Sequence, residues 1–108
     1  MAGRHGRNSQ EMVRRIVVQR SVRREIDEVT GSYEQIRKGL GAKFYGEVLE
    51  ILSMIEMYLE MYAEIRPRIR RAVVRGYPYN LFYVVGMRRV SVLALFHQAE
   101  DPDKWPSI

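Results

Sequence analysis

The sequence predicts an α+β fold in which a helical hairpin packs on a small, mainly antiparallel sheet. One short β-branched run, two segments with helical spacing and three strand-like runs follow one another, which gives the order β-α-α-β-β-β. At 108 residues the chain is too short to form two domains that each bury a useful core. We therefore expect one domain over residues 11–108, preceded over residues 1–10 by a polar leader that is disordered or appended.

The N-terminal part predicts one strand and one helix. Met12–Val18 is rich in β-branched residues, and it is long enough for a strand but short for a helix. After Ser21, whose hydroxyl suits a helix N-cap, apolar residues recur at steps of three and four as far as Ile36. Gly39 and Gly41 then end this helix, since glycine adopts the left-handed conformation that is common after a helix C-terminus. The short link makes the next helix antiparallel to the first.

The second helix, expected from Ala42 to about Tyr62, carries two apolar stripes. The first has core spacing and consists of Phe44, Val48, Ile51, Leu52, Ile55, Leu59 and Tyr62. The second lies about 100° around the helix and consists of Met54, Met57, Tyr58 and Met61. A small domain cannot easily bury both stripes, so we expect the second to be an exposed surface for a partner. The alternative is a helix that is buried on two sides.

The C-terminal half predicts three strands, over Ile69–Arg75, Tyr79–Val85 and Val90–Phe96. Short links between these runs indicate antiparallel hairpins. Alternation along the middle strand places Tyr79, Leu81, Tyr83 and Val85 on one face and Phe82 and Val84 on the other. The tail from Glu100 is acidic and irregular, and we expect its Trp105 to pack back on the domain.

The chain carries a net charge of +5, and the five arginines between residues 66 and 75 have no acid among them. Such a cluster attracts a polyanion or an acidic partner, although arginines also protect strand edges from aggregation. Composition leaves both interpretations open. The absence of cysteine excludes disulfides, thiolate metal sites and a cysteine nucleophile, and it fits the reducing cytoplasm. We expect neither a signal segment nor a membrane contact, because the N-terminus is polar and glutamates interrupt the most apolar stretch.

Four groups of residues, in order over nearly the whole chain, resemble the ParE-like branch of the RelE/ParE toxin family. The first, similar to its helical hairpin, is Tyr33-Glu34, Gly39-Leu40-Gly41, Phe44 and Glu47-Val48. The second, similar to its arginine-bearing strand, is Tyr62, Ile65 and Ile69-Arg70-Arg71. The third is Arg75, Tyr77-Pro78-Tyr79 and Tyr83. The fourth, similar to its terminal segment, is Val92-Leu93-Ala94, His97-Gln98, Asp101-Pro102 and Trp105.

The resemblance implies the toxin half of a bacterial type II toxin–antitoxin pair. It implies a hetero-oligomer with a cognate antitoxin of the ribbon-helix-helix, ParD-like kind, with DNA reached only indirectly through that antitoxin. ParE-like members are described as poisoning DNA gyrase without nuclease chemistry, whereas RelE-like members are ribosome-dependent endoribonucleases that cut mRNA. We favour the growth-inhibiting gyrase poison, which is not an enzyme, over the endoribonuclease. Neither interpretation needs a cofactor or a metal. A DNA- or RNA-binding module without toxic action is a third interpretation.

Under this resemblance, the exposed stripe of Met54, Met57, Tyr58 and Met61 is the expected antitoxin site. The expected target-binding residues are Arg71, Arg75, Tyr77 and His97. An endoribonuclease would use Arg75 to hold the phosphate and His97 as general acid or base. A lone histidine at a strand end is more often a structural hydrogen-bonding group, which favours binding over catalysis. Even spacing predicts that Arg71 and Arg75 share one face of their strand and that Arg70 faces the other way.

Three positions depart from the family pattern. Glu100 stands where the family usually has arginine, and its negative charge beside His97 argues against RNA cleavage there. Gly76 replaces a frequent basic residue. Leu59 stands where a proline usually ends the second helix, so we expect this helix to run about one turn further and to carry Met61 with it.

Overall fold

The computed structural model describes residues 14–107, so the leader expected over residues 1–10 lies outside the described part. No helix of residues 14–107 is long and apolar enough to cross a bilayer. The elements follow the order expected from the sequence, with one short strand and one short 3-10 helix in addition. They are β1 (Arg15–Val18), α2 (Arg20–Ile36), α3 (Leu40–Met57), β2 (Glu64–Arg66), β3 (Ile69–Val73), β4 (Tyr79–Val85), β5 (Arg89–His97) and η1 (Pro102–Lys104).

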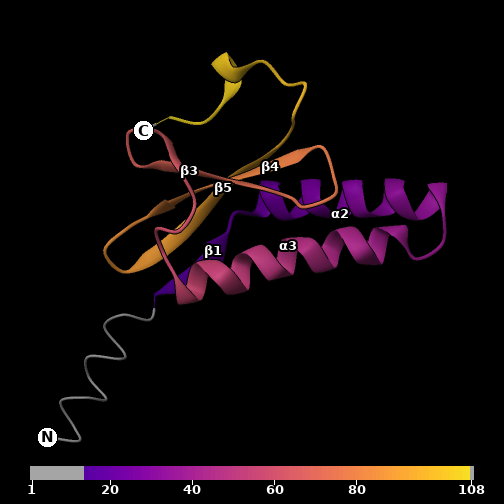
Figure 1. Cartoon of the computed structure of the whole chain (residues 1–108), viewed down its shortest axis with the longest axis horizontal. Coiled ribbons are helices and arrows are strands. Elements are labelled where there is room, and N and C mark those ends of the chain that lie inside the picture. Colours follow the sequence, from indigo (N-terminus) through magenta and orange to yellow (C-terminus); the bar gives the residue numbers. More distant parts are fainter. Residues whose placement is uncertain (1–13, 108) are drawn as a thin grey trace, which may run out of the picture.

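The strands form a five-stranded sheet in the order β1-β5-β4-β3-β2. Neighbouring strands are antiparallel, except that β1 lies parallel to β5. The chain leaves β1 directly into the helical hairpin of α2 and α3, and both helices cover the same face of the sheet (Figure 1). The α+β fold class is therefore confirmed. The added strand β2 has three residues and pairs with β3 at the sheet edge.

Two glycines and one glutamate shape the link between the helices. Gly39 has a φ of 91°, a left-handed conformation that glycine adopts without strain. The carboxylate of Glu34 accepts hydrogen bonds from the backbone N–H groups of Gly39 (2.9 Å) and Gly41 (3.0 Å). These bonds satisfy donors that the start of a helix otherwise leaves free. A Cβ on Gly41 would clash with the carbonyl oxygen of Thr30, so this glycine allows the two helices to approach closely.

The main core lies between the helical hairpin and one face of the sheet. Its buried residues include Val22, Ile26, Phe44, Val48, Ile51, Ile55, Ala72, Val74, Leu81, Tyr83, Val90, Val92 and Leu95. The alternation expected for β4 is confirmed, because its odd-numbered residues pack in this core while Phe82 and Val84 face the other way. In β5 a bulge leaves Leu93 without an opposite residue, since Phe82 pairs with Ala94 and Tyr83 pairs with Val92.

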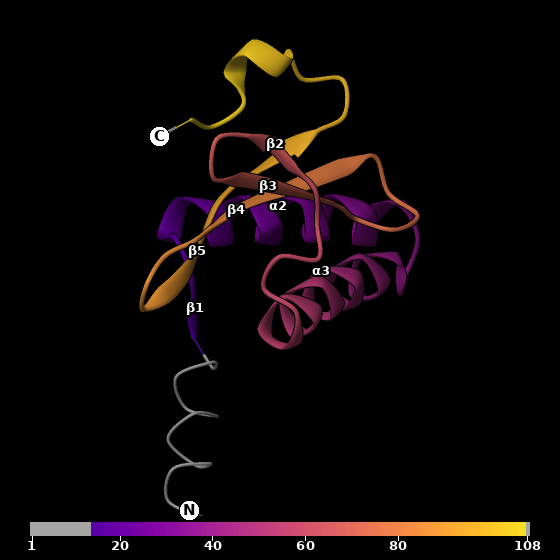
Figure 2. The ribbon, with the colours of Figure 1, turned by 60° about the vertical axis from the view of Figure 1, so that its left-hand side comes forward.

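The C-terminal segment covers a second, smaller apolar cluster on the opposite face of the sheet. Ile69, Phe82 and Ala94 are buried there, and the centre of the Trp105 ring lies 5.3 Å from the centre of the Phe82 ring. Arg66 holds the segment, because its guanidinium donates to the carbonyls of Pro102 (2.6 Å) and Trp105 (3.0 Å). Figure 2 shows this segment, in yellow, on the side of the sheet away from α3. The expectation that Trp105 packs back on the domain is confirmed.

Candidate functional site

An apolar groove lies at the C-terminal end of α3. It has a volume of about 650 Å³ and is lined by Arg14, Met54, Met57, Tyr58, Leu59, Glu60 and Met61. Met57, Tyr58 and Met61 are 63%, 55% and 46% exposed, which leaves a contiguous apolar surface that no other part of residues 14–107 covers. The four residues expected to bind an antitoxin thus line a single groove, which we call the methionine groove.

The methionine groove exists because α3 ends at Met57. The expectation that Leu59 lets this helix run on to about Tyr62 is wrong. The hydroxyl of Tyr83 donates to the Leu59 carbonyl at 3.0 Å. Arg70 donates to two further carbonyls, at 3.1 and 2.7 Å, those of Glu60 and Tyr62. These bonds to the sheet take carbonyls that a continuing helix would use, so Met61 reaches the groove from a turn.

A second groove, smaller and more polar, continues from the first along α3. It has a volume of about 300 Å³ and is lined by Glu47, Glu50, Ile51, Met54, Tyr62, Val73 and Arg75. Met54 lines both grooves and so connects them. Burial, together with the negative charge of Glu50, raises the pKa of the Tyr62 hydroxyl above its ordinary value of 10.0. The second groove therefore combines apolar side chains with charges of both signs.

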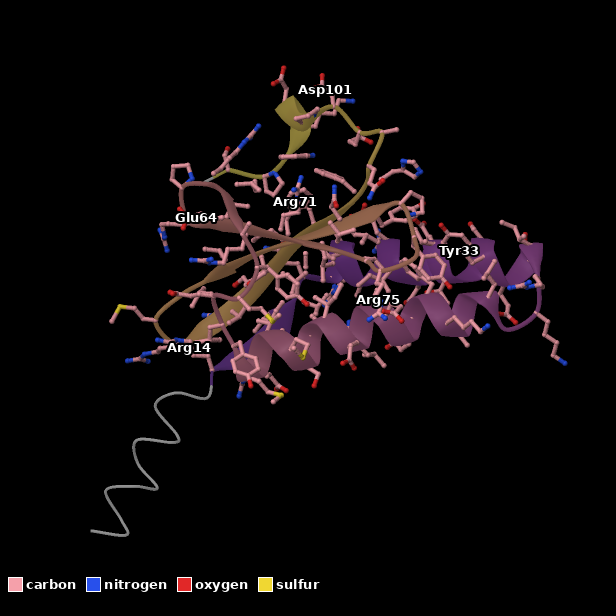
Figure 3. All side chains as sticks on the ribbon, in the orientation of Figure 1. Arg14, Tyr33, Glu64, Arg71, Arg75 and Asp101 are labelled. Atoms are coloured by element: carbon pink, nitrogen blue, oxygen red, sulfur yellow. The ribbon has the colours of Figure 1, made fainter. Side chains whose placement is uncertain are left out.

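The three arginines expected to carry charge-dependent function lie in different surroundings. The guanidinium of Arg71 lies 5.4 Å from the centre of the Trp105 ring, on the face of the sheet away from the helices. Arg70 faces the opposite way and forms an ion pair of 3.6 Å with Glu64, so the expected opposition of Arg70 and Arg71 is confirmed. Arg75 lines the second groove, and Figure 3 shows it close to α3.

The expectation that Arg71 and Arg75 share a face is therefore wrong. Strand alternation carries the direction of a side chain only as far as the strand continues, and β3 ends at Val73 instead of Arg75. Beyond that point the chain turns, and Gly76 has a φ of 85°. Arg75 thus joins the α3 side of the molecule while Arg71 stays beneath the C-terminal segment.

Tyr77 belongs to an aromatic cluster beside the helical hairpin. Its ring centre lies 4.9 Å from that of Tyr33 and 5.2 Å from that of Phe44. Its hydroxyl donates to the Leu40 carbonyl at 3.2 Å. These contacts attach the turn between β3 and β4 to the start of α3, and they leave Tyr77 half-buried.

His97 is exposed at the end of β5 and orders the turn that follows. Its Nδ1 accepts a hydrogen bond from the backbone N–H of Ala99 at 3.0 Å, and its ring lies edge-to-face on Tyr79 at 5.1 Å. Because an accepting Nδ1 carries no proton, the proton of the neutral ring lies on Nε2. The nearby Glu100 pairs with Lys104 at 3.4 Å. Within residues 14–107, no carboxylate or other side chain forms a hydrogen bond with this imidazole.

The sequence alone did not reveal Arg14 as a residue of the methionine groove. Arg14 precedes β1, and Figure 3 shows it beside the end of α3. It reaches the groove because β1 pairs with β5, a partner more than seventy positions away in the chain. Local spacing carries no information on such a pairing, and the arginine pair before the first apolar run was the available signal.

Among residues 14–107, no group of three or more acidic or histidine side chains is placed to hold a metal ion. No protein-family model matches the sequence, and no curated protein matches it. Among solved structures, the chain is similar to one described as "Chromosomal ParDE TA system from P. aeruginosa", with a TM-score of 0.68 and 12% sequence identity. The similarity covers 80% of this chain and 97% of the other. This chain therefore has a ParE-like fold.

Proposed function

We propose that the chain is the toxin of a type II toxin–antitoxin pair and that its methionine groove binds the antitoxin. The observation that carries the proposal is the fold, because nearly the whole of a chain from a ParDE TA system, 97% of it, corresponds to this one. A fold can serve several functions, so the site has to support the assignment as well. The position and chemistry of the methionine groove supply that support.

The methionine groove suits an amphipathic segment of a ParD-like antitoxin. Methionine side chains are flexible and polarisable, so they adapt to the shape of an apolar partner. Each 100 Å² of apolar surface removed from water contributes about 2.5 kcal/mol, before the entropy cost of association is subtracted. Arg14 and Glu60 line the same groove with opposite charges, and they would fix the direction in which the partner segment lies.

The arrangement of the polar residues favours gyrase over mRNA as the target. Cleavage of RNA requires a base, an acid and a cation that converge on one phosphate. Arg71 lies under Trp105, Arg75 lies over α3 with two glutamates, and His97 uses Nδ1 to bind Ala99. These candidates do not converge on one point, which supports a toxin that acts by binding. The ribosome-dependent endoribonuclease remains the alternative that the test must separate.

The antitoxin site is tested by co-purification with a ParD-like antitoxin of the ribbon-helix-helix kind. Met57→Glu combined with Met61→Glu should weaken the complex at least a hundredfold, because two charges would then face an apolar partner. The matched control is Ile36→Glu with Leu49→Glu, since these side chains are 72% and 47% exposed and lie outside the groove. The control should bind normally. Unchanged binding of the groove variant would exclude this site.

The target is tested with the purified chain in two assays. We expect it to inhibit supercoiling by gyrase, or to trap cleaved DNA, and to leave mRNA intact on translating ribosomes. Ribosome-dependent cleavage of mRNA without an effect on gyrase would favour the endoribonuclease. An absence of both effects, together with an absence of growth inhibition, would contradict the toxin assignment itself.

A further inference from the structure

A second basic surface lies at the β1 end of the sheet, apart from the arginines between residues 66 and 75. Four arginines from two segments meet there: Arg14 and Arg15 at the start of β1, and Arg88 and Arg89 at the turn into β5. The strand register places Arg15 directly beside Arg89. The Nε of Arg14 donates to the carbonyl of Met87 at 3.1 Å and so ties the two segments together. We call these four residues the arginine edge.

Arg15 and Arg89 are exposed and project from the same face of the sheet. Their neighbours Ile16 and Val90 pack in the main core, so alternation directs both arginines to the opposite face. Like charges at directly neighbouring positions of a sheet repel each other and weaken the pairing. A sequence selected for stability alone would place an acid or a neutral residue at one of these positions. Such local conflicts tend to mark functional surfaces.

The arginine edge has no acidic partner within the described residues. The ion pairs of residues 14–107 join Arg70 to Glu64 and Lys104 to Glu100, and neither involves the edge. Glu60 shares the methionine groove with Arg14 but forms no ion pair with it. No acid of residues 14–107 therefore compensates these four charges, and the net charge of +5 adds a long-range attraction for a polyanion.

Met87 lies at the tip of the hairpin between β4 and β5 and is 93% exposed. An apolar tip flanked by arginines has the chemistry of proteins that contact duplex DNA through a groove. In such contacts the guanidinium groups hold phosphates by paired hydrogen bonds, and an apolar side chain rests against or between bases. We propose that the arginine edge and Met87 form a contact surface for the phosphate backbone of double-stranded DNA. This contact is independent of the toxin assignment and would add a direct contact to the indirect one expected through an antitoxin.

The test measures how the affinity of the full chain for a labelled DNA duplex of about 30 base pairs depends on salt, between about 50 and 200 mM. Each phosphate contact adds about −0.9 to the slope of log affinity against log salt, so the two co-facial arginines, Arg15 and Arg89, contribute about −1.8. Arg15→Gln with Arg89→Gln should therefore make the slope less negative by about 1.8. Met87→Ser should lower the affinity without changing the slope. The matched control is Arg37→Gln with Lys38→Gln. These two residues are exposed just after the C-terminal end of α2. The control loses the same charge and should keep the slope of the wild type.

Folding and partner binding are measured alongside. Removing the repulsion should leave the melting temperature of the Arg15→Gln, Arg89→Gln variant equal to or above that of the wild type, and its binding to an antitoxin should not change. An unchanged slope in this variant, or an equal loss in the control, would overturn the proposal. Tighter binding to an RNA duplex of the same length would exclude DNA as the preferred ligand. Displacement of DNA by polyglutamate at equal charge concentration would instead indicate an acidic protein partner.

Discussion

Replacing Tyr83 with phenylalanine tests how the methionine groove is held in place. Tyr83 is fully buried, and its hydroxyl donates a hydrogen bond of 3.0 Å to the carbonyl of Leu59, which lines the groove. Phenylalanine keeps the edge-to-face arrangement with Tyr62, in which the two ring centres are 6.3 Å apart. The substitution removes a hydrogen bond worth about 1 kcal/mol and leaves a carbonyl unpaired, at a further cost of about 1–3 kcal/mol. Because Leu59 is only half-buried, water can reach this carbonyl, and we expect a total loss of about 1–2 kcal/mol.

Thermal unfolding followed by circular dichroism measures this loss. In a domain of this size, 1 kcal/mol lowers the melting temperature by about 4–8 °C, so a decrease of roughly 5–15 °C is expected. Affinity for the antitoxin should fall as well, because the segment after α3 is then less well held. Tyr45→Phe is the matched control, since Tyr45 lies on α3, is 40% exposed and forms no side-chain hydrogen bond within residues 14–107. A melting temperature within about 2 °C of the wild type, or an equal decrease in the control, would refute the reasoning.

Three further outcomes follow from the structure. Gly39→Ala should lower the free energy of unfolding by about 1–2 kcal/mol, because φ is 91° at this position. Gly31→Ala should raise the free energy of unfolding by up to about 1 kcal/mol, because the added Cβ lies in α2 and meets no atom within 4 Å. Urea unfolding measures both changes. Burial raises the pKa of the Tyr83 hydroxyl above 10.0. The stability that the protonated Tyr83 hydroxyl contributes is therefore fully present below pH 10.0, and it is lost as the pH rises through the pKa of Tyr83 in the folded protein. The free energy of unfolding should consequently fall less steeply at alkaline pH in Tyr83→Phe than in the wild type. His97→Gln keeps a hydrogen-bond acceptor for Ala99 and should change growth inhibition less than about threefold, whereas an endoribonuclease would lose about 10²–10⁴-fold in mRNA cleavage.

Segments with a strong local pattern could be predicted closely from the sequence. The alternation of β4 gave its bounds, Tyr79–Val85, and its inward residues. The helical spacing of the first helix ended at Ile36, where α2 ends. In contrast, β2 has three residues and no period of its own, and it forms because it pairs with β3. Likewise, the place of β1 beside β5 follows from tertiary packing of the helical hairpin, and its sequence shows only that it is a strand.

The errors at the candidate site have one physical cause, which is that tertiary hydrogen bonds and turns override local spacing. Apolar residues at helical spacing continue past Met57, so the local pattern favours a longer helix. Tyr83 lies 24 positions from the carbonyl that it binds, and no periodicity over a few turns contains that information. Alternation predicts the direction of Arg75 only if β3 continues as far as this residue, and β3 ends at Val73. The exposure of Met57, Tyr58 and Met61 could be predicted because it follows from their apolar character and helical spacing, whereas the turn that carries Met61 and the presence of Arg14 in the groove could not.

The methionine groove and the arginine edge meet at Arg14, and this has a thermodynamic consequence. Arg14 lines the groove, and its guanidinium also binds the carbonyl of Met87 at the hairpin tip. A partner that fills the groove therefore changes the surroundings of one charge in the arginine edge. An acidic segment there would lower the potential that attracts phosphates, whereas an apolar segment would exclude water and strengthen it. By thermodynamic linkage, bound DNA must change the affinity of the partner for the groove by the same factor by which the partner changes the affinity for DNA. The sign of this coupling therefore reports the charge of the segment that occupies the groove.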